Sequence, residues 1–260
     1  MKMNIFKQFI KSLYSPKDIS MFRFQGIGKT ILYVFFLTLI SVIPTIYFLS
    51  TSIMNSVEEI TNSIENEFPD FYIEDGELHS EENKPLTIPG NDMVIQFDST
   101  GTLTSEDIRS DQNTVALLKD EFVFVAGGQV QTYDYSMLTG MTFSKQEITE
   151  YLAAADSFLI IVLLIMAIII YLFSAGLRFI EVSILALIGL LIKNMMNRKL
   201  QYRQTWRMSA YSITLSTIFF TIMASLQTVV PNGALISWLV GIVVLLLAIR
   251  EVPQPKNNNV

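Results

Sequence analysis

The sequence predicts an α-helical integral membrane protein with a small, β-rich α+β domain inserted between its first and second membrane spans. Of the 260 residues, 51% are hydrophobic and 16% are charged, whereas soluble domains carry about 25% charged residues. The charge is divided unequally, because residues 51–156 hold 21 of the 24 acidic groups and 4 of the 18 basic ones. The remaining segments contain apolar runs approaching or exceeding the roughly 20 helical residues that cross a bilayer.

The N-terminal segment, residues 1–30, is basic and amphipathic. Ser15-Pro16 has the form of a helix start, with serine as the N-cap and proline at the first helical position. Before it, apolar residues recur at helical spacing beside Lys7 and Lys11, which predicts an interfacial helix on an anionic inner leaflet. A docking surface for a cytoplasmic partner is the alternative. The apolar residues are Ile5, Phe6, Phe9, Ile10, Leu13 and Tyr14.

Four membrane spans are predicted at residues 31–50, 157–177, 209–230 and 234–249, and residues 250–260 form a cytoplasmic tail. The first span contains Pro44, which predicts a kink. No small-residue cleavage site follows it, so a retained anchor is expected rather than a secretory signal. Pro231-Asn232-Gly233 separates the last two spans as a tight turn.

The apolar stretch Phe179–Ile192 is ambiguous, because it has a length typical of interfacial or re-entrant helices and contains Glu181. It belongs to the basic segment 178–208, which is expected at the cytoplasmic side. Charge favours four crossings plus one interfacial or re-entrant helix, since this topology keeps the flanking basic residues and the N-terminus inside. Five crossings, with the following basic residues outside, is the alternative.

Residues 51–156 form the acidic extracytoplasmic domain. The first span is expected to continue outward as an amphipathic helix over Ser52–Phe68. Three hairpins are predicted, which turn at Asp75-Gly76, at Asp98–Gly101 with a return near Thr102–Thr104, and at Gly127-Gly128 between Phe122–Ala126 and Gln129–Tyr135. Ser144–Glu147 is a capping box, which predicts a helix that runs into the second span.

The composition excludes several kinds of chemistry. The chain has no cysteine, which excludes disulfides, thiolate metal sites and cysteine nucleophiles. It has one histidine, which excludes most histidine-dependent catalysis. Asp98–Gly101 begins like a calcium loop but lacks the alternating oxygen ligands that follow in such loops. We therefore expect no catalytic residues, no cofactor and no metal, and the basic segments beside the spans are not expected to bind nucleic acid.

Three groups of residues are candidate sites. Lys199, Arg203 and Arg207 lie four apart, so they are expected to share one helix face beside Trp206. This face is predicted to be either a positive cytoplasmic flank or a phospholipid headgroup site. Arg178 and Glu181 lie three residues apart. They are predicted to be either a functional ion pair inside the membrane or a pair that neutralises itself at the level of the lipid headgroups. A repeat of small hydroxyl side chains predicts a helix-packing face, with a polar transport path as the alternative. That face consists of Thr214, Thr217, Thr221, Ser225 and Thr228.

A family resemblance follows from this order of elements together with the stretch Tyr202–Tyr211, YRQTWRMSAY, which leads into Thr214. The chain resembles the bacterial domain-of-unknown-function family 1189, whose members are also close to 260 residues long. Some members are labelled maltodextrin-utilisation membrane proteins, which implies a link to carbohydrate uptake. The helical part is also similar to the Yip-type membrane-protein superfamily, which implies five spans. No catalytic motif comes with the resemblance.

We therefore expect a non-enzymatic accessory or sensory protein of a bacterial plasma membrane. Its outer domain would bind a ligand or partner, and its helices would contact lipids and another membrane complex, such as a carbohydrate transporter for maltodextrin. The alternative is a small autonomous transporter or a lipid-handling protein, which would need a polar route through the helices.

Overall fold

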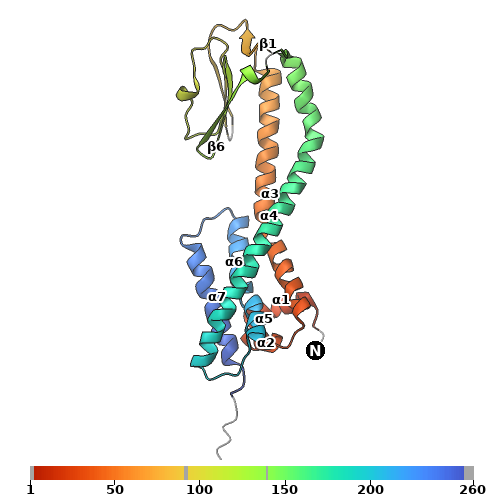
Figure 1. The fold of residues 1–260 in the computed structure, drawn as a ribbon, viewed down its shortest axis with the longest axis vertical. Helices are drawn as coiled ribbons and strands as arrows, with labels where there is room; N and C mark the ends of the chain where they lie inside the picture. The colour runs from red at the N-terminus through yellow and green to blue at the C-terminus, as the bar shows by residue number, and fades with distance from the viewer. Residues whose placement is uncertain (1–2, 91–92, 139, 255–260) are drawn as a thin grey trace, which may run out of the picture. The chain divides into compact units, whose positions relative to one another are not determined.

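The computed structural model describes residues 3–90, 93–138 and 140–254, and for residues 153 and 155–157 only the backbone. The chain forms two compact units, each shown in Figure 1. The helical unit comprises residues 1–48 and 165–260, and the β unit comprises residues 49–164. Two long helices, α3 (Ile27–Asn66) and α4 (Lys145–Met195), contribute residues to both units.

The described part of the helical unit contains five further helices: α1 (Ile5–Tyr14), α2 (Pro16–Phe22), α5 (Tyr202–Ser212), α6 (Thr214–Ser225) and α7 (Gly233–Arg250). The predicted start of α2 is confirmed, because the Ser15 side chain accepts a hydrogen bond from the Asp18 backbone N–H at 3.3 Å. Asp18 also accepts a hydrogen bond from Lys11 at 3.0 Å, which joins the ends of α1 and α2. The Ser15 hydroxyl holds the pKa of Asp18 below its ordinary value, and Lys11 adds to this effect.

Among the residues that the structure describes, four helical segments are long and apolar enough to cross a membrane: α3, α4 from Phe158, the pair α5–α6, and α7. The predicted order, with a β-sheet region between the first and second of these apolar helices, is thus confirmed. The third predicted span, 209–230, extends beyond the end of α6 at Ser225. The turn before α7 is present, with Asn232 in the left-handed conformation at a φ of 54°.

The prediction of a separate interfacial or re-entrant helix at Phe179–Ile192 is wrong. These residues continue α4 without interruption to Met195. The sequence from Ser157 to Met195 contains no proline, and Arg178 and Glu181 form an ion pair three residues apart, a spacing that supports a helix. The 38-residue apolar part of α4 measures about 57 Å at 1.5 Å per residue, which exceeds the bilayer core of about 30 Å.

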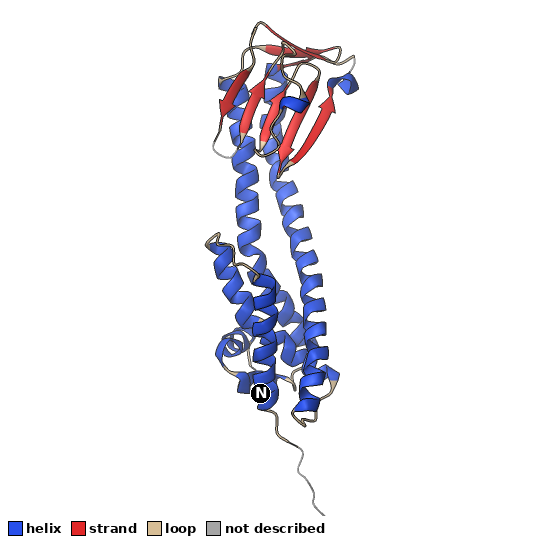
Figure 2. Cartoon of the chain, turned by 90° about the vertical axis from the view of Figure 1, so that its left-hand side faces the viewer, coloured by secondary structure: helices blue, strands red, loops and turns tan. Residues whose placement is uncertain are grey.

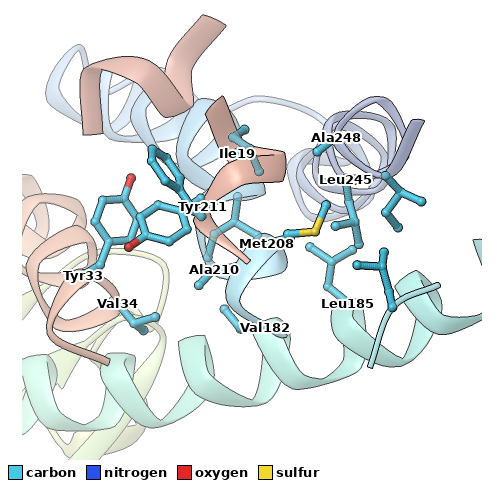
Figure 3. Close-up of a cluster of buried hydrophobic side chains, with 14 of the residues drawn as sticks. Ile19, Tyr33, Val34, Val182, Leu185, Met208, Ala210, Tyr211, Leu245 and Ala248 are labelled. Carbon is cyan, nitrogen blue, oxygen red and sulfur yellow. The ribbon is translucent and has the colours of Figure 1, made fainter. Parts of the chain in front are cut away.

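The core of the helical unit lies where α2, α3, α4, α5 and α7 meet (Figure 3). Tyr33 and Tyr211 are fully buried, and their ring centroids lie 4.2 Å apart. Leu185 of α4 and Leu245 of α7 are also buried there. Small residues such as Ala210 let the helices approach closely, and close packing is what holds helices together where lipid offers no hydrophobic driving force.

The described residues of the β unit form two sheets, with strand orders β2-β1-β8 and β3-β4-β5-β6-β7. Figure 2 shows the strands in red. The turns at Asp75-Gly76 and Gly127-Gly128 join β1 to β2 and β6 to β7, which confirms two of the three predicted hairpins. Two short 3-10 helices, η1 (Ser105–Asp107) and η2 (Tyr135–Leu138), lie between strands. The strands are β1 (Phe71–Glu74), β2 (Glu77–Ser80), β3 (Leu86–Pro89), β4 (Val94–Phe97), β5 (Thr114–Leu117), β6 (Glu121–Ala126), β7 (Gln129–Asp134) and β8 (Phe143–Ser144).

The predicted return strand at Thr102–Thr104 is wrong. After β4 the chain forms a loop, and β4 pairs antiparallel with β3 and parallel with β5. The reason is the Asp98 carboxylate, which is fully buried and accepts hydrogen bonds from the backbone N–H groups of Thr100 at 2.8 Å and Leu103 at 2.6 Å. The carboxylate thus replaces the strand partner that a hairpin would provide for these N–H groups.

Both long helices pack against the sheets of the β unit. Ile64 on α3 and Phe68 just beyond its end are buried with Phe97, and the rings of Phe68 and Phe97 lie 5.0 Å apart. The helix predicted at Ser52–Phe68 is present as the end of α3. The capping box that starts α4 is also confirmed, since the Ser144 N–H donates to Glu147 at 2.8 Å and the Glu147 N–H donates to Ser144 at 3.2 Å.

We expect the Asp98→Asn substitution to destabilise the β unit by about 1–3 kcal/mol. The asparagine NH₂ group is a donor, so it would replace one of the carboxylate oxygens that now accept hydrogen bonds from backbone N–H groups. Burial raises the pKa of Asp98, but the hydrogen bonds from Thr100, Leu103 and Thr102 outweigh it, so the pKa lies below its ordinary value. The stabilisation is therefore present above the ordinary carboxyl pKa and is lost as the pH falls through the lower folded value. Hydrogen exchange of the β4 and β5 peptides in the full-length protein measures the destabilisation by Asp98→Asn. The substitution of the exposed Asp120 by asparagine is the control. Equal protection in the two variants would contradict the prediction.

Candidate functional site

A cleft of about 670 Å³ lies within the helical unit, between α3, α4, α6, α7 and the loop that joins α6 to α7. Its apolar lining includes Val42 of α3, Leu177 of α4 and Phe220 of α6. Two charged side chains, Arg178 and Glu181, belong to the described residues that line it. Seven hydroxyl side chains also line the cleft: Ser41, Thr45, Ser174, Thr217, Thr221, Thr228 and Ser237.

The charged residues of the cleft form an ion pair on α4. Arg178 Nη1 and Glu181 Oε2 are 2.7 Å apart, and the two side chains are only 19% and 18% exposed. Three-residue spacing on a helix places the two side chains on one face, which is why the sequence positions them together. The ion pair makes the site electrically neutral, while the guanidinium retains further N–H donors and the carboxylate retains further lone pairs.

Four of the seven hydroxyl groups of the cleft donate their protons to backbone carbonyls. Ser41, Thr217 and Thr221 each donate their hydroxyl proton to a backbone carbonyl three or four residues earlier in the chain, at 2.8 Å. Thr228 donates in the same way to the Leu226 carbonyl at 3.2 Å. A hydroxyl whose proton is used in this way still offers oxygen lone pairs. This part of the wall therefore suits a ligand that carries hydrogen-bond donors.

A smaller groove of about 290 Å³ adjoins the cleft between α4 and α7. Arg178, Glu181 and Ser237 line both the groove and the cleft. The groove is otherwise apolar, with Ile180 and Ile184 on α4, which are 57% and 43% exposed, and with Trp238 on α7. The polar cleft thus opens onto an apolar surface of the helical unit.

The predicted hydroxyl face is divided by the structure. Thr214 and Thr217 are buried, and Thr214 contacts the Tyr33 hydroxyl at 2.6 Å, as expected for helix packing. Thr217, Thr221 and Thr228 line the cleft. Thr228 lies beyond the end of α6, so it reaches the cleft from the loop rather than from the helix face. Ser225 is exposed at the end of α6.

Comparison with protein families identifies the chain. The family described as "Protein of unknown function (DUF1189)" matches residues 6–249. The chain belongs to the DUF1189 family. No curated protein and no solved structure matches the chain.

The basic group of this DUF1189 chain does not form a single helix face. Lys199 precedes α5, which begins at Tyr202, because Asn197 takes a left-handed conformation at φ 54° and ends α4. Lys199 and Arg203 are exposed, whereas Arg207 donates to the Arg23 backbone carbonyl at 2.9 Å and ties α5 to the end of α2. The expectation of one shared face is therefore wrong for Lys199.

Trp206, the aromatic member of that group, packs inside the helical unit. Its indole N–H donates to the Ser183 hydroxyl at 3.2 Å, and its ring stacks on Phe179 at a centroid distance of 6.3 Å. Arg207 and Trp206 thus fix α5 to its neighbours, while Lys199 and Arg203 are exposed on the surface of the helical unit.

Sequence reasoning missed a buried polar cluster between α1, α3, α5 and α6. Gln8 and Ser12 of α1 face the helical unit and are almost fully buried, whereas Phe6 and Ile10 are more than half exposed. The Tyr211 hydroxyl donates to Gln8 Oε1 at 2.8 Å. The signal in the sequence was a polar stripe at positions 8 and 12, four residues apart on the helix. An apolar outer face fits the predicted interfacial helix, because membrane rather than water would cover it.

We expect the Tyr211→Phe substitution to loosen α1 by about 1–2 kcal/mol, because it removes the hydroxyl that satisfies the buried Gln8 carbonyl. Hydrogen exchange of the α1 peptide in detergent-solubilised protein measures the effect. The exposed Tyr202→Phe is the matched control and should leave α1 protection unchanged. Unchanged protection in Tyr211→Phe as well would show that the hydrogen bond does not hold α1.

Proposed function

We propose that this protein is a non-enzymatic accessory or sensory protein of a bacterial plasma membrane. One observation carries the proposal: α3 and α4 each run as one helix through residues of both the β unit and the helical unit. A ligand or partner bound to the β unit can then act on the membrane helices through two continuous helices, without a flexible linker. The N-terminus is cytoplasmic and the β unit extracytoplasmic in this proposal.

The unequal charge supports this orientation. Outside residues 51–156 the chain carries 14 of its 18 basic residues, and basic residues beside spans favour the cytoplasmic side. Because the chain has no cysteine, single introduced cysteines test the orientation directly. In intact cells an impermeant maleimide should label Gln131→Cys in the β unit but not Asn197→Cys after α4. Both positions should react once the membrane is permeabilised. Labelling of Asn197→Cys in intact cells would exclude the proposed topology.

The edge strand β7 is the surface proposed to receive a partner. It ends the five-stranded sheet, and all six of its residues are exposed. Its single charged residue, Asp134, lies at its end, and edge strands with few charges are available for pairing with a strand of another chain. The family resemblance suggests a carbohydrate transporter, with maltodextrin as its substrate, as the membrane complex that the helices contact.

Affinity purification from native membranes in mild detergent, with mass spectrometry of the recovered proteins, tests the accessory function. A transporter or signalling complex should be recovered in stoichiometric amount. Val130→Lys on β7 should reduce this recovery, because lysine on an edge strand opposes pairing. Met137→Lys, at an 80% exposed position outside β7, is the matched control. Recovery of the protein without any partner would contradict the accessory function.

A second candidate function, autonomous lipid or solute handling, is favoured by the cleft. The cleft unites the Arg178–Glu181 pair with part of the hydroxyl face, the two features on which a polar route would depend. Purified protein in liposomes should then move a lipid or solute between the two sides. Inactive but folded protein, tested against a broad panel of lipids and solutes, would contradict this second function.

A further inference from the structure

We infer that the cleft and the adjoining groove together bind one zwitterionic phospholipid whose headgroup carries a primary ammonium. Its phosphate would meet Arg178, its ammonium would meet Glu181 and the hydroxyl oxygens, and its acyl chains would follow the groove between α4 and α7. This inference rests on the second candidate function, because it names the ligand of that cleft. It does not depend on a partner for the β unit.

The charge of the site selects a zwitterion. Arg178 and Glu181 neutralise each other at 2.7 Å, and both are mostly buried. An anionic headgroup at Arg178 would place its phosphate beside the Glu181 carboxylate, and an unpaired charge away from water is costly. A zwitterionic headgroup brings a positive and a negative group together, so each member of the ion pair gains a counter-charge and the net charge stays zero.

The hydrogen-bonding character of the wall selects a primary ammonium. Ser41, Thr217 and Thr221 use their hydroxyl protons on backbone carbonyls and offer oxygen acceptors. An –NH₃⁺ group has three donors for such acceptors and for Glu181, whereas a trimethylated ammonium has none. The site should therefore prefer phosphatidylethanolamine to phosphatidylcholine, although both headgroups are zwitterionic.

The shape of the site selects a lipid rather than a free headgroup. Arg178 and Glu181 line both the polar cleft and the apolar groove. Ile180 and Ile184 present apolar surface beside them. Water-soluble phosphoethanolamine would occupy the cleft alone and leave this apolar surface uncovered, whereas an acyl chain covers it.

The position of Trp238 in the groove provides the assay. Trp206 and Trp238 are the two tryptophans of the chain, so Trp206→Phe leaves a single fluorophore at the proposed site. The full-length protein is reconstituted in phosphatidylcholine vesicles that contain a minor fraction of lipid with brominated acyl chains. Brominated phosphatidylethanolamine should quench Trp238 with a relative association constant roughly ten-fold above those of brominated phosphatidylcholine and phosphatidylglycerol, the scale of one charge-assisted hydrogen bond.

Further variants in the Trp206→Phe background identify the groups responsible. Glu181→Gln preserves the shape of the side chain but leaves Arg178 without its counter-charge. It should therefore abolish the preference for phosphatidylethanolamine over phosphatidylcholine and favour the anionic phosphatidylglycerol. Thr221→Val, which removes one acceptor of the cleft, should weaken the preference, and Ser225→Ala, outside the cleft on the same helix, should retain it. In the Trp206→Phe protein without further changes, equal quenching by the three lipids or stronger quenching by phosphatidylglycerol would overturn the assignment. A preference for phosphatidylethanolamine over phosphatidylcholine that survives Glu181→Gln would also overturn it.

Soluble phosphoethanolamine distinguishes the source of the headgroup. Added to the vesicles, it should not relieve the quenching by brominated phosphatidylethanolamine, and relief at low millimolar concentration would assign the site to a soluble ligand instead. Because the assay measures equilibrium binding, its outcome is separate from that of lipid movement in liposomes. Selective binding without movement would contradict only the second candidate function.

Discussion

Replacing Arg178 with methionine should destabilise the protein by about 3 kcal/mol, because the Glu181 carboxylate would remain mostly buried without a counter-charge. For a protein of this size, that loss corresponds to a fall of about 10 °C in the unfolding midpoint. The shift is measured by heating purified protein in detergent to a series of temperatures. Size-exclusion chromatography then gives the fraction that stays folded at each temperature.

The double variant Arg178→Met/Glu181→Met should recover most of the lost stability, because it removes both charges together. Lys11→Met provides a second comparison in the same unit. It breaks the ion pair of Lys11 with Asp18, and it should change the midpoint little because solvent screens that pair. If the double variant is no more stable than Arg178→Met, the destabilisation comes from lost packing around Arg178 rather than from an uncompensated charge.

Replacing Gly189 with leucine should destabilise the helical unit by about 1–3 kcal/mol through overpacking. A Cβ atom at Gly189 would lie 3.1 Å from Leu245 of α7 and 3.4 Å from Thr205 of α5. The glycine thus permits close approach of α4 to two other helices. The same thermal unfolding measurement detects the effect.

Gly176→Leu is the matched control, since it makes the same substitution on the same helix. A Cβ atom at Gly176 would meet nothing within 4 Å. Leucine is the better helix former by roughly 0.8–1 kcal/mol, so this variant should be neutral or more stable. An equal loss of stability in both variants would show that the effect arises from α4 itself and not from its contacts with α5 and α7.

Local signals in the sequence predicted much of the fold. The Ser15 cap, the Ser144–Glu147 capping box and the Asp75-Gly76 turn all act within a few residues, and the structure confirms each. The prediction of a strand at Thr102–Thr104 failed because the buried carboxylate of Asp98 accepts hydrogen bonds from backbone N–H groups of the loop. The prediction of a separate helix at Phe179–Ile192 failed because the positive-inside argument concerns the side on which flanking basic residues lie and does not say where a helix ends. The pairing of Arg178 with Glu181 supports the continuation of α4.

By itself, the sequence determined the membrane class, the apolar spans, the ion pair and the hydroxyl repeat, because these depend on composition and on helical spacing. Only the tertiary structure decided that the ion pair shares one cleft with Thr217, Thr221 and Thr228, and that Gln8 and Tyr211 meet inside the helical unit. These contacts join residues on separate helices. The packing of whole helix surfaces sets such contacts, and no spacing along a single helix encodes them.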